Sequence, residues 1–133
     1  MKEDKKNQSL KSMCELNVLI VDDEVVSTDL LEAYLEDEVK SISFTKSGLK
    51  AVEICRNNPS IDVVLMDIRL IDLDGYEATR KIRKFNKEIL IIAQTAYALV
   101  GDQEKALAAG CNDYISKPID KDYFMSVLKK HLT

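Results

Sequence analysis

The segment NVLIVDDE (residues 17–24) is the strongest indication of the fold, because it joins a short apolar run directly to three acids. An apolar run of this length, without strict alternation, is typical of a strand that helices cover on both faces of a parallel sheet. Four further runs of the same kind follow along the chain: SISFT (41–45), DVVLM (62–66), ILIIAQ (89–94) and NDYIS (112–116). The sequence therefore predicts five strands.

Segments with helical spacing lie between and after these runs, because their apolar residues recur at steps of three or four. These residues are Leu31, Tyr34, Leu35 and Val39; Leu49, Val52 and Cys55; Tyr76, Thr79 and Ile82; Leu99, Ala106 and Ala109; and Phe124, Val127, Leu128 and Leu132. Strands that alternate with helices through right-handed crossovers form a parallel, doubly wound sheet. The predicted fold class is α/β, with five strands and five helices.

Length and composition predict one domain. The chain has 133 residues, of which 46% are hydrophobic and 32% charged, and this is ordinary globular composition. Residues 1–15 are polar and charged and are interpreted as a tail or linker, which leaves 16–133 as the domain. The sequence has no apolar run of the ~20 residues that a membrane span needs and no stretch that resembles a signal peptide.

The charge and the cysteines exclude further classes of protein. A net charge of −4 without a basic block disfavours direct binding of nucleic acid. The three cysteines contain no CxxC pair, so a disulfide framework or a zinc knuckle is not expected. A reducing, cytoplasmic setting fits this pattern.

The predicted strand ends carry a particular set of polar residues. Asp22 and Asp23 follow the first run, and Asp67 follows the third. A lone aspartate at such a junction is explained as a helix cap. Three carboxylates within ~5 Å, however, repel one another by several kcal/mol at an effective dielectric constant of ~20, so such a cluster indicates a bound cation. An all-oxygen ligand set, with no histidine or cysteine at these strand ends, favours Mg²⁺ over zinc or iron.

Thr95 and Lys117 end the fourth and fifth runs and complete the set. Taken singly, Thr95 is an ordinary strand-end residue and Lys117 a solvated lysine. Together with Asp67 on the intervening strand, they supply the hydroxyl and the ammonium that a phosphoryl dianion needs beside a metal ion. Asp67 is then the predicted nucleophile, whose carboxylate forms an acyl phosphate. Pro118 restricts Lys117 to extended geometry and permits a cis peptide bond.

These positions, with the turn DGYE (74–77), resemble the receiver domain of two-component response regulators (CheY-like) over residues 16–132. The stretch 93–119 resembles receivers of hybrid sensor kinases in particular. The resemblance implies a flavodoxin-like sheet in the strand order 2-1-3-4-5. It also implies the roles of individual residues: Asp67 as phosphoacceptor; Asp22, Asp23, Asp67 and the backbone carbonyl of Arg69 as Mg²⁺ ligands; Thr95 and Lys117 as the phosphoryl-sensing pair; and Tyr114 as a switch aromatic, with ordinary strand packing as its alternative.

The implied function is that of a signalling module in a phosphorelay. Asp67 accepts a phosphoryl group from phosphohistidine with Mg²⁺, and a protein-binding face then switches. The implied partners are a histidine kinase or histidine phosphotransfer protein and a downstream effector protein or domain, without contact to nucleic acid or membrane. The domain is expected to be no enzyme by itself, although a hybrid sensor containing it would be a histidine kinase, and to be a monomer or a weak, phosphorylation-dependent dimer. The only histidine, His131 near the C-terminal end of the last helix, is a poor phosphodonor.

Two departures from the family pattern stand out. Ile71 occupies the position where the family often has proline, and with Leu73 it indicates either a partner contact or loop packing. Arg69 and Tyr97 lie two residues after Asp67 and Thr95, beside the path of the attacking water. Large side chains at these two positions are expected to slow hydrolysis of the acyl phosphate.

Three other functions are compatible with an α/β fold of this kind. An aspartate-nucleophile phosphohydrolase usually has a second acid two residues after its nucleophile, where this chain has Arg69. A flavodoxin-like cofactor binder needs a phosphate loop rich in Ser, Thr or Gly after the first strand, and DDEVV (22–26) is its electrostatic opposite. An interaction domain that works without phosphorylation remains open, but it does not require the acidic set.

Overall fold

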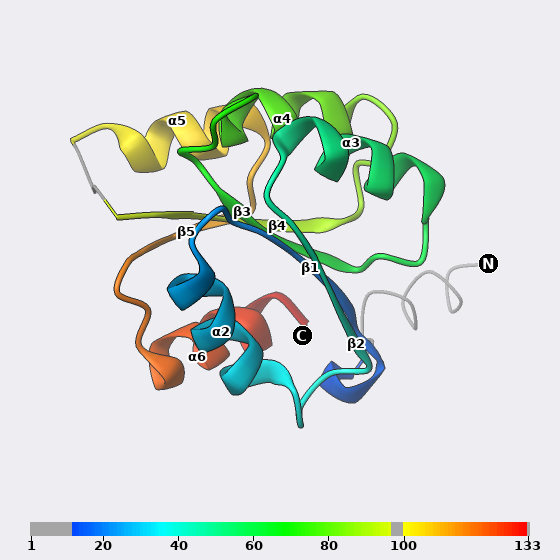
Figure 1. The fold of residues 1–133 in the computed structure, drawn as a ribbon, viewed down its shortest axis with the longest axis vertical. Coiled ribbons are helices and arrows are strands. Elements are labelled where there is room, and N and C mark those ends of the chain that lie inside the picture. The colour runs from blue at the N-terminus through cyan, green and yellow to red at the C-terminus, as the bar shows by residue number, and fades with distance from the viewer. Residues whose placement is uncertain (1–11, 97–99, 133) are drawn as a thin grey trace.

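The computed structural model describes residues 12–96 and 100–132. Its elements follow the predicted alternation of strands and helices (Figure 1). In chain order they are the 3-10 helix η1 (Met13–Glu15), β1 (Asn17–Val21), α2 (Val25–Leu35), β2 (Ser41–Thr45), α3 (Gly48–Asn57), β3 (Val63–Asp67), α4 (Gly75–Arg83), β4 (Leu90–Thr95), α5 (Asp102–Ala109), β5 (Asp113–Ser116) and α6 (Lys121–Leu132). The strands form one parallel sheet in the order β2-β1-β3-β4-β5, which confirms the predicted fold class and order.

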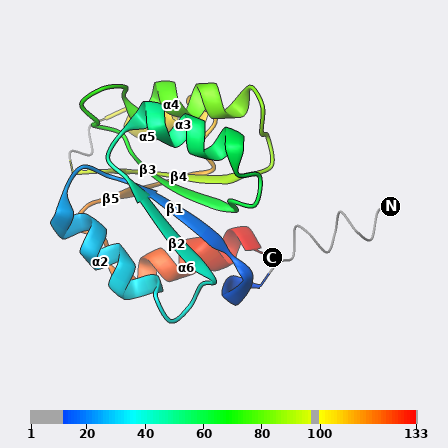
Figure 2. The same ribbon diagram turned by 45° about the vertical axis from the view of Figure 1, so that its right-hand side comes forward.

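Helices cover both faces of this sheet. Helices α3, α4 and α5 lie on one face and α2 and α6 on the other, as the two views of the ribbon show (Figures 1 and 2). Each layer has its own apolar core: residues of α3 and α4 pack with Val64 and Met66, whereas residues of α2 and α6 pack with Val63 and Leu65. Every residue of β3 is buried, which explains why its sequence reads as a continuous apolar run.

The second strand departs from the predicted burial. β2 is an edge strand, and three of its five residues, Ser41, Ser43 and Phe44, are exposed. Its run SISFT therefore marks a strand, but not a strand that is covered on both sides.

The first helix is shorter than its apolar spacing predicts. α2 ends at Leu35, whereas the pattern continues to Val39. The residues that follow Leu35 are three acids, Glu36 to Glu38, and negative charge is unfavourable at a helix C-terminus. The chain forms a turn there instead, in which the backbone N–H groups of Glu38 and Val39 donate to the carbonyl of Leu35.

Strand register brings the predicted polar residues to one edge. Val21 pairs with Met66, so Asp22 follows β1 beside the end of β3 at Asp67. Asp67 pairs with Gln94, and Thr95 pairs with Ser116, the residue before Lys117. The Lys117–Pro118 peptide bond is cis.

Among residues 12–96 and 100–132, none of the helices combines the length and the apolar character that crossing a bilayer requires.

Candidate functional site

The three aspartates predicted to share a site come together at the carboxyl edge of the sheet. Asp22, Asp23 and Asp67 each offer a carboxylate oxygen, and these oxygens all lie within 4.8 Å of one another. Asp22 and Asp67 are buried, and Asp23, which is half-buried, is the most exposed of the three; the space between these three side chains is called the acidic cleft, or the cleft, below. A group of three carboxylates with an opening to solvent suits a hard divalent cation that keeps part of its water shell.

The environment of Asp67 disfavours its negative charge. Burial raises the pKa of its carboxyl group to about 6, and the charge of Asp22 acts in the same direction, while Lys117 and the backbone N–H of Arg69 act against it. That N–H donates to Oδ1 of Asp67 over 3.2 Å. A carboxylate in this position gains from a bound cation, so the donor set fits Mg²⁺.

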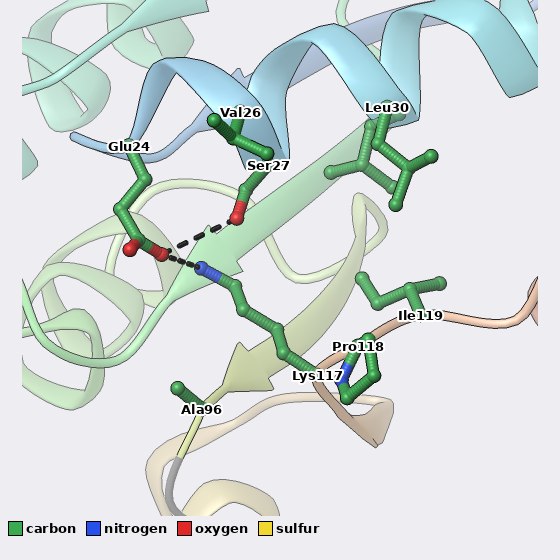
Figure 3. Close-up of a pocket in the computed structure, with 9 residues that line it drawn as sticks. Glu24, Val26, Ser27, Leu30, Ala96, Lys117, Pro118 and Ile119 are labelled. Atoms are coloured by element: carbon green, nitrogen blue, oxygen red, sulfur yellow. Dashed lines mark hydrogen bonds and ion pairs between the residues drawn. The ribbon is translucent and has the colours of Figure 1, made fainter.

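Lys117 extends its ammonium into the cleft and meets three carboxylates. Its Nζ lies 2.9 Å from Oδ2 of Asp22, 3.1 Å from Oε1 of Glu24 and 3.5 Å from Oδ2 of Asp67. The contact with Glu24 was not predicted, although Glu24 is the third acid of the run that follows the first strand. The hydrogen bond and the charge of Lys117 lower the pKa of Glu24, whose Oε1 also accepts a bond from Oγ of Ser27 at 3.3 Å (Figure 3).

Thr95 and Tyr114 lie on neighbouring strands beside this cleft. Thr95 is buried, and its carbonyl accepts a 2.7 Å bond from the backbone N–H of Lys117, which fixes where the lysine leaves the sheet. Tyr114 is half-buried and packs against the core beneath α3, α4 and α5. Within the described part of the chain, its buried hydroxyl has no hydrogen-bond partner. Tyr97 lies outside the described residues.

The loop after Asp67 is hydrogen-bonded to the start of α3, a connection that the sequence did not predict. Asp72 accepts hydrogen bonds from Oγ of Ser47 at 2.6 Å and from the backbone N–H groups of Gly48 at 3.0 Å and Leu49 at 3.3 Å, all at the start of α3. These donors lower the pKa of Asp72 to about 2. In the same loop the side chain of Leu73 packs against the core, while Ile71 is 91% exposed.

A groove of about 440 Å³ adjoins the cleft and shares Lys117 with it (Figure 3). Its walls come from the first half of α2 and from the segment between β5 and α6. The lining is apolar apart from Glu24, Ser27 and Lys117, and its apolar residues are Val26, Leu30, Leu31, Ala96, Pro118 and Ile119. Val26 is 82% exposed, which leaves an apolar surface open beside the acidic cleft.

His131 takes no part in the cleft. Its Nε2 lies 2.9 Å from Oδ2 of Asp113, the first residue of β5, at the opposite edge of the sheet from Lys117. The contact with Asp113 accounts for the position of this histidine.

Comparison with known proteins places these features in a family. The family model for the response regulator receiver domain matches residues 18–129. The signal transduction histidine-protein kinase BarA of Escherichia coli (strain K12) is 36% identical over 123 residues, which are 91% of this chain but only 13% of BarA. The polar-differentiation response regulator DivK of Brucella ovis is 35% identical over 118 residues, which are 87% of this chain and 95% of DivK.

Solved structures agree with the sequence relatives. The receiver domain of the sensor histidine kinase PA1611 from Pseudomonas aeruginosa superimposes with a TM-score of 0.80 at 36% identity, covering 89% of this chain and 98% of that domain, and holds a magnesium ion in its active site cleft. The receiver domain of Ssk1 from Saccharomyces cerevisiae was crystallised with the histidine phosphotransfer protein Ypd1. It superimposes with a TM-score of 0.77 at 33% identity, covering 90% of this chain and 88% of that chain. Because the family model spans most of the chain and DivK matches along nearly its whole length, this chain belongs to the response regulator receiver domains, the signalling modules of two-component systems.

Proposed function

We propose that Asp67 is the phosphoacceptor of this receiver domain. The observation that carries the proposal is the meeting of three carboxylates and one ammonium at the carboxyl edge of the sheet, with Asp67 on the central strand β3. In the proposed reaction a carboxylate oxygen of Asp67 attacks phosphorus, the bond from phosphorus to the imidazole nitrogen of the donor breaks, and its electron pair stays on that nitrogen. The product is an acyl phosphate on Asp67.

The proposed Mg²⁺ site consists of Asp22, Asp23 and Asp67, with the backbone carbonyl of Arg69 as a further ligand. The clustered oxygens and the raised pKa of Asp67 support this assignment. When bound, Mg²⁺ would share the charge of the phosphoryl oxygens and orient them for in-line displacement. Lys117 provides the second positive charge and Thr95 a hydroxyl donor, as a dianionic group requires.

The proposed response to phosphorylation is a conformational change of the side chains of Thr95 and Tyr114. The hydroxyl of Thr95 turns toward the phosphoryl group, Tyr114 moves inward, and the face formed by α5, β5 and α6 changes for a downstream effector protein or domain. The hydroxyl of Tyr114 has no hydrogen-bond partner among the residues that the structure describes, and this supports the proposal because no such bond has to break when the side chain moves.

The proposed phosphodonor is a histidine kinase or a histidine phosphotransfer protein that docks near α2. The groove beside the cleft supports this choice, because its exposed Val26 and Leu30 line the same groove as Lys117, and the imidazole must approach Asp67 from this side. We also propose that Arg69 and Tyr97 slow hydrolysis of the acyl phosphate. If truncation of both side chains to alanine leaves the half-life of the phosphate unchanged, this second proposal fails.

Intact mass spectrometry after incubation with acetyl phosphate and Mg²⁺ tests the main proposal. The wild-type chain is expected to gain one phosphoryl group that hydroxylamine removes, whereas Asp67→Asn gains none. Asp62→Asn is the matched control, because Asp62 is an aspartate of the same region that lies outside the cleft, next to the start of β3. A stable adduct on Asp67→Asn, or no adduct on the wild type, would contradict the assignment.

A further inference from the structure

The ammonium group of Lys117 contacts three carboxylates at once. A lysine ammonium has three N–H donors, and here each has one acceptor within reach. Nζ lies 2.9 Å from Asp22 and 3.1 Å from Glu24, and its longest contact, 3.5 Å, is with Asp67. The two shorter contacts therefore hold the ammonium closer to the β1–α2 side of the cleft than to Asp67.

Glu24 differs from the other two acceptors in its surroundings. Its side chain is 60% exposed, whereas those of Asp22 and Asp67 are 0% and 6% exposed. It stands at the N-cap position of α2, outside the group of three aspartates that could hold a metal ion. The carboxylate of Glu24 can consequently turn away from Lys117 toward solvent without moving any of these three aspartates.

The carboxylate of Glu24 is itself held in place. The same oxygen, Oε1, accepts from Nζ of Lys117 and from Oγ of Ser27, so its two donors come from α2 and from the residue after β5 (Figure 3). This arrangement bridges the two walls of the groove at the border with the acidic cleft.

A phosphoryl group on Asp67 competes with this bridge for the same ammonium. The group adds oxygens with about two negative charges, and charge-assisted bonds to them are stronger than a bond to a solvated carboxylate. We propose that Glu24 is a positioning residue that holds Lys117 away from Asp67 in the unphosphorylated domain and loses this lysine when the phosphoryl group forms. The inference rests on the proposed function of Asp67.

The affinity for beryllofluoride, a phosphoryl mimic, tests this role at saturating Mg²⁺. The titration is followed through the backbone amide signals of the cleft by NMR, because the chain has no tryptophan. Glu24→Gln is expected to bind the mimic more tightly by roughly two- to fivefold, since exposed ion pairs contribute up to about 1 kcal/mol. Asp29→Asn, which removes one charge from an exposed position of the same helix, is the control and is expected to change the affinity by less than twofold.

Glu24→Asp separates competition for Lys117 from the general effect of charge. This variant keeps the negative charge but is shorter by one methylene, so it withdraws the carboxylate from Nζ. If Glu24 acts by holding Lys117, Glu24→Asp also binds beryllofluoride more tightly than the wild type. If Glu24→Asp behaves as the wild type while only Glu24→Gln binds more tightly, the inference is wrong and the effect is one of net charge.

The same titration distinguishes failure of the inference from failure of the proposed function. Failure of the wild type to bind beryllofluoride, or equal binding by Asp67→Asn, overturns the function of Asp67. Binding by the wild type that depends on Asp67, with both Glu24 variants equal to the wild type, overturns the role of Glu24 alone.

Discussion

Oδ2 of Asp67 lies 3.5 Å from Nζ of Lys117, and yet this ammonium does not offset the burial of the carboxylate. The pKa of Asp67 stays raised to about 6, because desolvation and the neighbouring charge of Asp22 outweigh the lysine. In the absence of a cation, the cleft therefore holds more negative charge than its positive charge balances. This imbalance makes the stability of the domain depend on pH and on Mg²⁺.

Asp67→Asn is expected to stabilise the metal-free domain at pH 7.5, by about 3 kcal/mol at most, the bound set by a pKa raised from 3.8 to about 6. A native pKa of about 6 lies above the ordinary value of 3.8, so the folded state binds more protons than the unfolded state between these pH values. The wild type therefore loses stability as the pH rises from about 4 through 6, and the variant does not. Urea unfolding at several pH values without Mg²⁺ measures the difference.

Mg²⁺ provides the control for this measurement. Saturating Mg²⁺ is expected to stabilise the wild type more than Asp67→Asn, because the variant lacks one of the three carboxylates of the proposed site. A stability difference that stays constant from pH 4 to 7.5 would contradict the assigned cause.

Several residues of the cleft could be predicted from the sequence, because the apolar runs show where the strands end. Asp22, Asp67 and Lys117 each come directly after a short apolar run, and parallel strands in the implied order bring them to one edge. The contact between Glu24 and Lys117 joins residues 93 positions apart, and it depends on the side-chain conformation of an exposed glutamate. No apolar pattern encodes such a conformation, so this contact could not be predicted.

The same limit applies to the loop after Asp67. The sequence shows that Ile71 stands where the family often has proline, but it does not show what else restrains this loop. Asp72 supplies a restraint of another kind, three hydrogen bonds to the start of α3, which depend on the path of the loop in space. The prediction for the second strand failed in burial for another reason: an apolar run does not by itself distinguish an edge strand from a central one, and the order 2-1-3-4-5 that the resemblance implies places β2 at an edge.

Asp72→Ala is expected to lower the free energy of unfolding by about 1 kcal/mol, as the loss of a helix cap does. The variant removes the acceptor for Ser47, Gly48 and Leu49 and frees the loop from α3. Because the native pKa of about 2 lies below the ordinary 3.8, the contribution of Asp72 is present above pH 4 and is lost as the pH falls toward 2. Thermal unfolding of the wild type and of Asp72→Ala between pH 3 and 7 measures this difference in stability.

Asp72→Asn is the matched variant for this link, because it keeps one side-chain oxygen as acceptor. It is expected to lose less stability than Asp72→Ala at pH 7. Equal stability of wild type and Asp72→Ala at pH 7 would show that the three hydrogen bonds do not hold the loop.

Gly110→Ala is expected to destabilise the domain by more than the ~1 kcal/mol that a left-handed backbone alone costs an alanine. Gly110 ends α5 with φ of +114°, and a Cβ there would lie 2.7 Å from Cγ of Arg83. Arg83 cannot withdraw freely, because its Nε donates to the carbonyl of Gly110 and its guanidinium also binds the carbonyl of Ile89. Denaturant unfolding measures the loss.

Gly101→Ala is the comparison for Gly110→Ala. Gly101 has φ of +90°, but among residues 12–96 and 100–132 no heavy atom lies within 4 Å of the place that a Cβ would take there, so this variant has the backbone cost without the collision. If the two variants lose equal stability, the contact with Arg83 contributes nothing.

Tyr114→Phe is expected to keep or raise the stability of the unphosphorylated domain, by up to about 1 kcal/mol. The hydroxyl of Tyr114 is buried without a hydrogen-bond partner in the described part of the chain, so its removal ends a desolvation cost and breaks no bond. Tyr76→Phe is the matched control, because the hydroxyl of Tyr76 donates to the carbonyl of Asp102 at 3.4 Å, and its loss should be neutral or destabilising. Urea unfolding without Mg²⁺ compares the two variants, and a clear loss of stability in Tyr114→Phe would mean that its hydroxyl is bonded in the resting state.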